Sequence, residues 1–133
     1  MKSKATIQFL RDWREFQHGM IERNGRLKVE YDMHRLPHCF TTWHGAGVGD
    51  ITAYIRFHPR GEVVSGSVIA PVRNQESPPG MIIGHVPAPF ETAVPDDADQ
   101  AEIWFHNFYQ TSTRCDAWDS RFGSNYWFEI DGT

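Results

Sequence analysis

Hydrophobic and polar residues alternate in several short stretches of this chain, with the period of two that is typical of β-strands. The clearest stretch is 51–58, ITAYIRFH, in which every second residue from Ile51 to Phe57 is apolar. The pattern predicts a half-buried strand. Pro59 and Gly61 follow it and favour a short hairpin loop, so we expect an antiparallel partner strand at 62–69.

A second stretch, 101–110 (AEIWFHNFYQ), alternates as well but carries aromatic side chains on both faces. Ile103 and Phe105 share one face, and Trp104 and His106 share the other. This pattern predicts either a strand that is covered on both sides or one whose outer face forms an aromatic platform. Weaker signals predict further strands at 6–10, 26–31, 81–86, 91–94 and 125–130.

Turn-forming residues separate these stretches at 41–49, 73–80 and 94–100. Only 11–16 shows a tendency to form a helical turn. Seven to eight short strands with regular turns predict an all-β fold, an antiparallel β-sandwich of the immunoglobulin-like type. With 133 residues, the chain is expected to form one domain, 1–133.

Composition agrees with this fold and narrows the function. Three Leu stand against nine Ile and eight Val, a choice that favours strands. The formal net charge is −4, with thirteen basic and seventeen acidic residues and no basic stripe, so a nucleic-acid partner is not expected. We find no apolar run that could span a bilayer, and expect no membrane partner and a cytoplasmic protein.

The two cysteines, Cys39 and Cys115, lie 76 positions apart. This spacing fits neither a disulfide framework nor a zinc knuckle, so reduced thiols are expected, with one long bridge as the open alternative. The seven histidines lack the spacing of known metal motifs, and Pro37 interrupts the pair His34 and His38. We therefore predict neither a metal nor a cofactor, and an extended loop around these histidines.

The densest unusual stretch is 115–128, CDAWDSRFGSNYWF. Its centre resembles the W-D-N-N-x-G-x-N-Y signature of starch- and glycogen-binding modules, which are β-sandwiches. The matching residues are Trp118, Asp119, Gly123, Asn125 and Tyr126. Ser120, Arg121 and Phe122 stand where those modules carry sugar-contacting asparagines.

Most of the chain also resembles a family of small, uncharacterised bacterial proteins that share Y-D-x-x-R-L-x-x-C, here Tyr31, Asp32, Arg35, Leu36 and Cys39. The residues of the C-terminal motif have a structural interpretation too, because Asp, Gly and Asn build rigid turns.

Taken together, these features predict non-catalytic binding of a carbohydrate or another hydroxyl-rich small ligand. Aromatic rings would stack on apolar sugar faces, and polar side chains would bind hydroxyls. The expected ligand-binding residues are Trp104, Trp118, Asp119, Asn125, Tyr126 and Trp127.

Two alternatives remain open. A small enzyme would use acid–base residues in a β-walled pocket to act on a small metabolite, and the candidates are Tyr54, His58, Glu102 and His106. A protein-interaction domain or homodimer would instead use its exposed aromatic side chains, such as Trp104 and Phe108, at an interface.

Overall fold

The computed structural model describes residues 4–36, 41–43, 46–48, 50–73, 75, 82–110 and 114–131. Within these residues the chain forms fourteen strands and one short 3-10 turn, η1 (Met33–Arg35). The strands are β1 (Lys4–Phe9), β2 (Glu15–His18), β3 (Ile21–Glu22), β4 (Arg26–Tyr31), β5 (Thr41–Trp43), β6 (Ala46–Val48), β7 (Asp50–His58), β8 (Glu62–Ser67), β9 (Ile69–Arg73), β10 (Ile82–Pro87), β11 (Phe90–Ala93), β12 (Gln100–Gln110), β13 (Arg114–Asp119) and β14 (Tyr126–Asp131). The predicted all-β class is confirmed.

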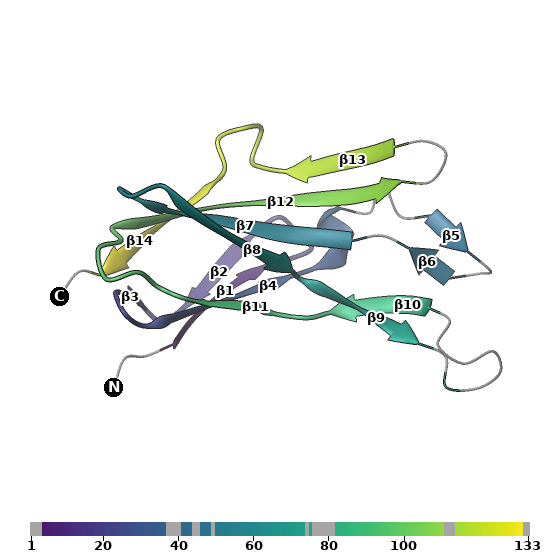
Figure 1. Ribbon diagram of the computed structural model, residues 1–133, viewed down its shortest axis with the longest axis horizontal. Helices are drawn as coiled ribbons and strands as arrows, with labels where there is room; N and C mark the ends of the chain where they lie inside the picture. The colour runs from purple at the N-terminus through teal and green to yellow at the C-terminus, as the bar shows by residue number, and fades with distance from the viewer. Residues whose placement is uncertain are drawn as a thin grey trace.

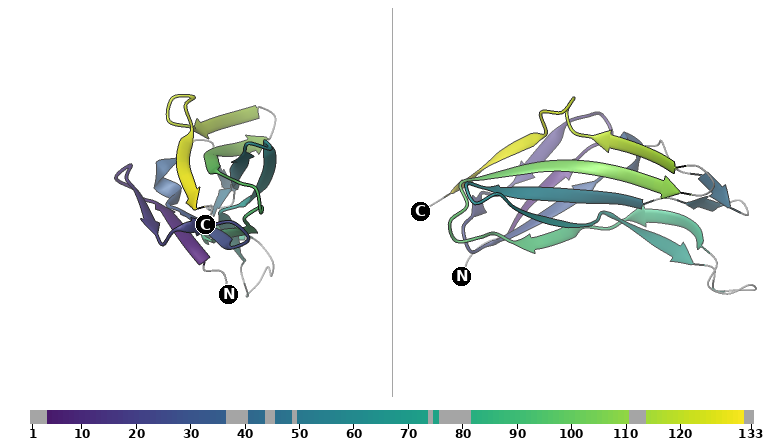
Figure 2. Two further views of the ribbon diagram at one scale, coloured as in Figure 1. Left: turned by 90° about the vertical axis from the view of Figure 1, so that its left-hand side faces the viewer. Right: turned by 45° about the horizontal axis from the view of Figure 1, so that its top comes forward.

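Two sheets face each other as the layers of a sandwich (Figure 1). One has the order β11-β4-β1-β2, and the other has the order β3-β14-β12-β7-β8, with β13 also paired to β12. Figure 2 shows the long β12 and β7 running side by side over the body, with the hairpins β5–β6 and β9–β10 extending from one end. The sandwich prediction is therefore confirmed.

Two strand pairs are parallel, β1 with β4 and β14 with β3, whereas the sequence predicted antiparallel pairing throughout. The chain passes from β2 to β3, which belongs to the opposite sheet, and then returns to β4. Because β2 already occupies one edge of β1, β4 pairs with the other edge after this crossover and runs in the same direction as β1.

The predicted hairpin at Pro59 and Gly61 is confirmed, since β7 and β8 pair antiparallel across it. The predicted strand 62–69 is divided into β8 and β9, and the predicted loop 41–49 contains the hairpin β5–β6. These divisions raise the strand count above the expected seven or eight.

Strand β12 changes its partner along its length. Gln100 to Ile103 pair with β14, and Phe105 to Gln110 pair with β13. Trp104 lies at the change, opposite the loop that connects β13 to β14. The other edge of β12 pairs with β7 from Gln100 to Phe108, so β12 is the central strand of its sheet.

The core lies between the sheets and uses the inward face of each alternating strand. The apolar face of β7, predicted from alternation, is fully buried, as are Ile103 and Phe105 of β12. The buried hydrophobic residues are Ala5, Ile7, Phe9, Ile21, Leu27, Val29, Tyr31, Leu36, Ile51, Ala53, Ile55, Phe57, Val68, Ile69, Val94, Ala98, Ala101, Ile103, Phe105, Tyr126 and Ile130.

The helical turn expected at 11–16 is wrong. Residues 11–14 lie in the β1–β2 loop, and Glu15 and Phe16 begin β2. In the loop, Leu10 donates its N–H to the Arg14 carbonyl and its carbonyl accepts from the N–H of Trp13. Trp13 has a φ of +68°, which a right-handed helix does not permit. The helical turn is η1 instead, capped by the Asp32 carboxylate, which accepts from the backbone N–H of His34.

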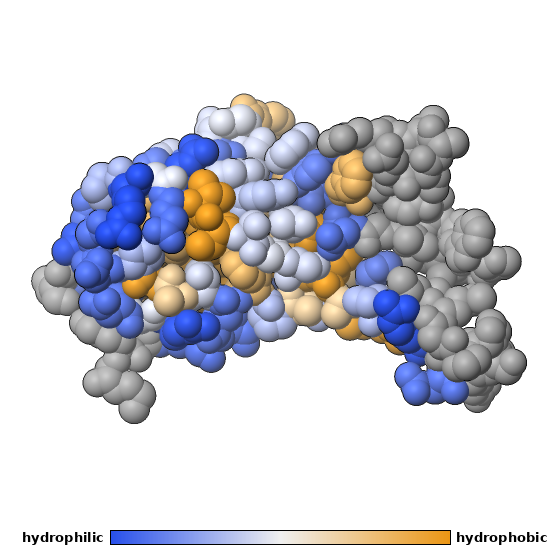
Figure 3. Space-filling view, in the orientation of Figure 1, coloured by the Kyte–Doolittle hydropathy of each residue, from blue (hydrophilic) through white to orange (hydrophobic). Residues whose placement is uncertain are grey.

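The two sheets approach each other closely at the edge formed by β8 and β11. A hydrophobic band reaches the surface in the view of Figure 3, between hydrophilic residues. A groove of about 330 Å³ between these edges is lined by Phe57, Val64 and Val94, among others. The edges meet where Phe90 packs against Gly66, with no room for a larger residue at Gly66.

Candidate functional site

The two sequence motifs, which lie about 85 residues apart, meet in a buried polar cluster of Tyr31, Arg35, Asp119 and Tyr126. Asp119 Oδ2 accepts from the Tyr31 hydroxyl at 2.7 Å and from Arg35 Nε at 3.0 Å. Asp119 Oδ1 accepts from the Tyr126 hydroxyl at 2.5 Å. The Tyr126 hydroxyl in turn accepts from Arg35 Nη2 at 2.8 Å. Every partner of the carboxylate within this cluster therefore comes from one of the two motifs.

Arg35 is fully enclosed although it carries a charge. Its guanidinium carbon lies 4.8 to 5.7 Å from the ring centres of Phe9, Trp13, Tyr31 and Tyr126. Its Nη1 also donates to the carbonyls of Leu10 and Arg14. Burial alone would lower the pKa of this side chain, but the charge of Asp119 raises it overall. Arg35 thus joins η1, the β1–β2 loop and the C-terminal motif.

The two tyrosines of the cluster are held in their neutral form. Burial raises the pKa of Tyr31, and the neighbouring charge of Asp119 raises it further. Burial and the hydrogen bond to Asp119 raise the pKa of Tyr126 in the same way. A phenolate beside the Asp119 carboxylate would bring two like charges together in a site with little water.

The loop between β13 and β14 has a left-handed backbone. Arg121, Phe122 and Gly123 have φ values of +49°, +57° and +90°. The Ser120 carbonyl accepts from the N–H of Gly123 at 3.0 Å, which closes a turn with two central residues of positive φ, as in type I′ turns. The side chain of Phe122 is fully exposed at the tip. A bulky residue in this conformation is unusual and costs about 1–2 kcal/mol.

Asn125 ends this loop and holds it to the sheet. It also has a positive φ, +61°. Its Nδ2 donates to Glu102 Oε2 at 2.6 Å, and Glu102 Oε1 lies 2.8 Å from His58 Nε2. Burial alone would raise the pKa of Glu102, but the hydrogen bonds from Asn125 and His58 lower it overall, with a further contribution from Arg56. Glu102 is therefore a buried anion that fixes both loop and histidine.

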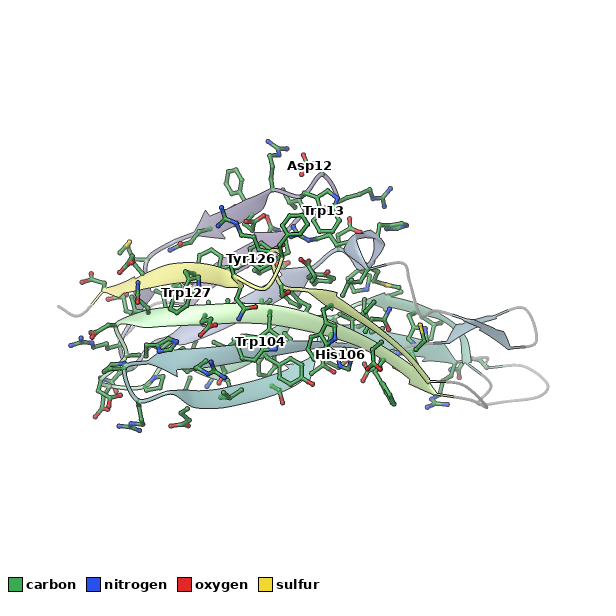
Figure 4. The ribbon with its side chains drawn as sticks, turned by 90° about the horizontal axis from the view of Figure 1, so that it is seen from above. Asp12, Trp13, Trp104, His106, Tyr126 and Trp127 are labelled. Atoms are coloured by element: carbon green, nitrogen blue, oxygen red, sulfur yellow. The ribbon has the colours of Figure 1, made fainter. Side chains whose placement is uncertain are left out.

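A groove of about 670 Å³ opens between this loop and the β1–β2 loop. Its walls carry three exposed aromatic side chains, Trp13, Trp118 and Phe122, of which Trp13 is 58% and Trp118 is 56% accessible. Tyr126 lies at its floor with Asp119, and Glu15 and Ser120 add polar atoms. Figure 4 labels Trp13, from the β1–β2 loop, and Tyr126, from β14, which line the same groove although they come from segments far apart in the sequence.

Trp118 lines the groove, and its ring is held in place by His106 and Asp116. Its ring stacks on His106 with 3.9 Å between ring centres and 17° between planes. His106 Nε2 lies 2.5 Å from Asp116 Oδ1. We call Asp116, His106 and Trp118 the Trp118 triad. The triad fixes one face of the indole against His106 and leaves more than half of the Trp118 surface accessible.

Glu15 is the acidic side chain of the groove that is not enclosed by the polar cluster. One carboxylate oxygen lies 3.6 Å from Arg35 Nη1, and the side chain is 25% accessible. Because Arg35 is paired mainly with Asp119, Glu15 keeps acceptor capacity that faces the groove. Arg121 lies at the exposed rim.

The expected ligand-binding residues fall into three groups. Trp118 lines the groove, while Trp104 and Trp127 lie on the outer face of the second sheet (Figure 4). The polar atoms of Asp119, Asn125 and Tyr126 are used inside the chain, in the hydrogen bonds described above. The structural interpretation of the motif therefore accounts for these three side chains.

Tyr54 and His58 lie on the outer face of β7, and Glu102 and His106 lie on that of β12, as alternation predicted for each strand. The pairing of β7 with β12 brings all four onto one surface. His58 contacts Glu102, Tyr54 stacks on Trp104 at 5.5 Å, and His106 belongs to the Trp118 triad. The two histidines are separated along the sheet and each has its own carboxylate. The structure thus joins His58 to Glu102 but pairs His106 with Asp116, which was not predicted, so the four residues do not form one centre.

Sequence reasoning missed Trp13, Glu15 and Phe122 as groove residues. Trp13 and Glu15 were assigned to a helical turn, where their side chains would not face the C-terminal motif. Phe122 was noted only as a departure from a sugar-binding signature. An isolated Trp and Phe in loop segments carry no periodic signal, so the pairing of the two loops appears only in the fold.

The structure corrects the expectation for one cysteine. Cys115 is disulfide-bonded, so the expectation of reduced thiols is wrong for this residue. The antiparallel pairing of β13 with β12 places Cys115 opposite Tyr109. Cys39 and His38 lie outside the described residues. His34 belongs to η1 rather than to an extended loop, and the described part of the chain contains no cluster of metal-binding side chains.

Within the described ranges, no helix is long and apolar enough to cross a membrane. A family model described as "Family of unknown function (DUF6209)" matches residues 1–131. No curated protein and no solved structure is significantly similar to the chain.

Proposed function

The chain belongs to the DUF6209 family, for which no function is known, and we propose from its geometry that it binds a carbohydrate or a similar hydroxyl-rich ligand without catalysis. The binding site is the groove between the β1–β2 loop and the β13–β14 loop. The observation that carries the proposal is the set of three exposed aromatic rings, Trp13, Trp118 and Phe122, that face one groove.

The size and lining of the groove suit such a ligand. A volume of about 670 Å³ lies within the range of small-molecule sites, roughly 300–1,000 Å³. Aromatic walls offer flat apolar faces, and Glu15 and Ser120 offer hydrogen-bond acceptors for hydroxyl groups. A sugar ring presents both kinds of surface.

Backbone strain supports a binding role for two of these rings. Trp13 and Phe122 both have positive φ values, and both side chains are largely exposed. Phe122 is fully exposed, so stability alone gives little reason to keep a large aromatic residue there, whereas Trp13 also covers the guanidinium of Arg35. Strained residues of this kind cluster at ligand sites.

The test is titration of the protein with a panel of gluco-, manno-, xylo- and chito-oligosaccharides, read by tryptophan fluorescence and by calorimetry. We expect saturable binding that is lost in Trp118→Ala and in Trp13→Ala. Phe16→Ala is the matched control, because Phe16 is an exposed aromatic residue outside the groove lining. Absence of binding across the panel, or equal binding by all three variants, would refute the proposal.

One observation favours the enzyme alternative, the hydrogen bond of 2.8 Å between His58 and Glu102. A carboxylate that orients an imidazole is common in acid–base catalysis. In this alternative, His58→Ala abolishes turnover of a bound ligand. Incubation of each bound oligosaccharide with the protein, followed by chromatography of the products, distinguishes an enzyme from a binding protein.

A further inference from the structure

On the outer face of the sheet that contains β7 and β12, Trp127 is held in the same way as Trp118. The ring of Trp127 stacks on His58 with 5.0 Å between ring centres and 22° between planes. His58 Nε2 lies 2.8 Å from Glu102 Oε1. We call Glu102, His58 and Trp127 the Trp127 triad. The indole Nε1 donates to the Ser124 carbonyl at 2.7 Å, which fixes the ring further.

The two triads have the same order of contacts. In each, a carboxylate binds a histidine, and the histidine ring supports a tryptophan whose surface remains about half accessible, 56% for Trp118 and 46% for Trp127. A histidine that is bonded on one side and stacked on the other leaves its tryptophan little rotational freedom. Such rigid aromatic rings lose little entropy when a ligand binds.

The two triads lie along β12, and the distance between them is greater than the length of a single sugar ring. Glu102 and His106 are four residues apart on β12, which corresponds to about 14 Å along an antiparallel strand. Their side chains point to the same face because the interval is even. Between them Trp104 stacks on Tyr54, with 7° between ring planes, and Arg56 lies 5.3 Å from the Trp104 ring centre. Aromatic and hydrogen-bonding groups thus continue from one triad to the other.

We propose that Trp127 is the second subsite of the same binding site and that the ligand is a neutral oligosaccharide chain rather than a mono- or disaccharide. This inference rests on the proposed function, because Trp118 is shared by the groove and the outer face. One end of the chain occupies the groove, and later units pass over Trp104 to Trp127.

The charges of this face favour a neutral chain over an anionic one. Each triad contains a carboxylate, Asp116 or Glu102, and Arg56 on this face already pairs with Glu102. The whole protein has a formal net charge of −4. A chain with a carboxylate, sulfate or phosphate on every unit would be repelled. Neutral hydroxyl groups meet no such cost.

The test compares ligand length with the position of each substitution. Calorimetric titrations use two series of ligands, maltose to maltoheptaose and cellobiose to cellohexaose. If another oligosaccharide binds in the panel above, shorter and longer members of its series are titrated as well. In the wild type we expect affinity to rise with length until the chain reaches both triads. Trp127→Ala should weaken the longest ligands about tenfold and leave disaccharides within about twofold.

Two variants separate the inference from the proposed function. Trp13→Ala should weaken ligands of every length, because Trp13 belongs to the groove. Val63→Ala is the matched control, since Val63 is exposed on β8 opposite Arg56 and outside both triads. If affinity does not depend on length and Trp127→Ala binds like the wild type while Trp13→Ala does not, the second subsite is refuted and the groove stands. If nothing binds at any length, both are refuted.

Discussion

Arg35 and Asp119 form a buried ion pair, with Nε and Oδ2 3.0 Å apart and both side chains at most 2% accessible. They are 84 positions apart in the sequence, and each belongs to one of the two motifs. Buried charges are tolerated when the geometry is good and the remaining donors and acceptors are satisfied. Here Tyr31, Tyr126 and two backbone carbonyls satisfy them. The pair ties the groove floor to the β1–β2 loop.

We predict that Asp119→Ala lowers the free energy of unfolding by about 3–5 kcal/mol, because it leaves the Arg35 charge buried without a counterion. Tyr126→Phe should cost only about 1 kcal/mol, since it removes one hydroxyl and retains the ring. Urea denaturation of both variants measures the difference. An Asp119→Ala variant no less stable than Tyr126→Phe would contradict the importance of this pair.

The two buried tyrosines predict a loss of stability in alkali. Their pKa values are raised in the folded state, first by burial and then by Asp119, whereas tyrosine in an unfolded chain ionises near pH 10. Below about pH 10 both states are protonated, and this contribution is fully present. Above it the unfolded chain loses protons first, so stability falls as the pH rises.

Urea midpoints measured from pH 8 to pH 11.5 check this prediction. Tyr31→Phe should fall less steeply above about pH 10 than the wild type, because one of the raised groups is gone. Tyr54→Phe, on the outer face away from the buried cluster, is the control and should follow the wild-type curve. Identical slopes for all three proteins would show that the buried phenols do not cause the alkaline loss.

The fold class was predictable because alternation is a local property. The segment 51–58 has four apolar residues at every second position, and all four are buried in β7. The same reasoning placed Tyr54 with His58 on one face of its strand, and Glu102 with His106 on one face of theirs. What it could not give is strand order, because β3 enters the opposite sheet through contacts that involve residues far away in the sequence.

The site was less predictable than the fold, for a physical reason. Trp118 was found because it stands in a dense motif. The roles of Asp119 and Asn125 depended on partners at Arg35 and Glu102, which no local pattern indicates. The positive φ of Trp13 gave no signal either, since Trp rarely adopts it. The sequence alone therefore does not distinguish a residue that contacts a ligand from one that has a structural role.

Gly66 provides a test of packing between the two sheet edges. A Cβ at this position would lie 2.3 Å from Phe90 Cδ1, closer than atoms can pack. We predict that Gly66→Ala lowers stability by about 1–3 kcal/mol, because the Phe90 ring must move. Gly84→Ala is the matched control, as a Cβ there meets open space in another strand. Thermal denaturation should separate the two variants, and equal melting temperatures would show that the Phe90 ring adapts without cost.

Phe122 should show a conflict between stability and binding. Its φ of +57° is unfavourable for any residue with a Cβ, and its side chain packs on nothing. Phe122→Gly should therefore raise the free energy of unfolding by about 1 kcal/mol while it weakens ligand binding. Phe122→Ala removes the same ring but keeps the Cβ, so it should bind as weakly as Phe122→Gly without the gain in stability.

Urea denaturation and calorimetric titration of these two variants distinguish strain from ring loss. The Gly variant differs from the Ala variant only in backbone freedom, and the Ala variant differs from the wild type only in the ring. If Phe122→Gly is more stable and both variants bind less tightly, the chain keeps a strained aromatic residue at the loop tip for its contact with a ligand. Unchanged affinity in both variants would remove Phe122 from the binding site and leave Trp13 and Trp118 as its walls.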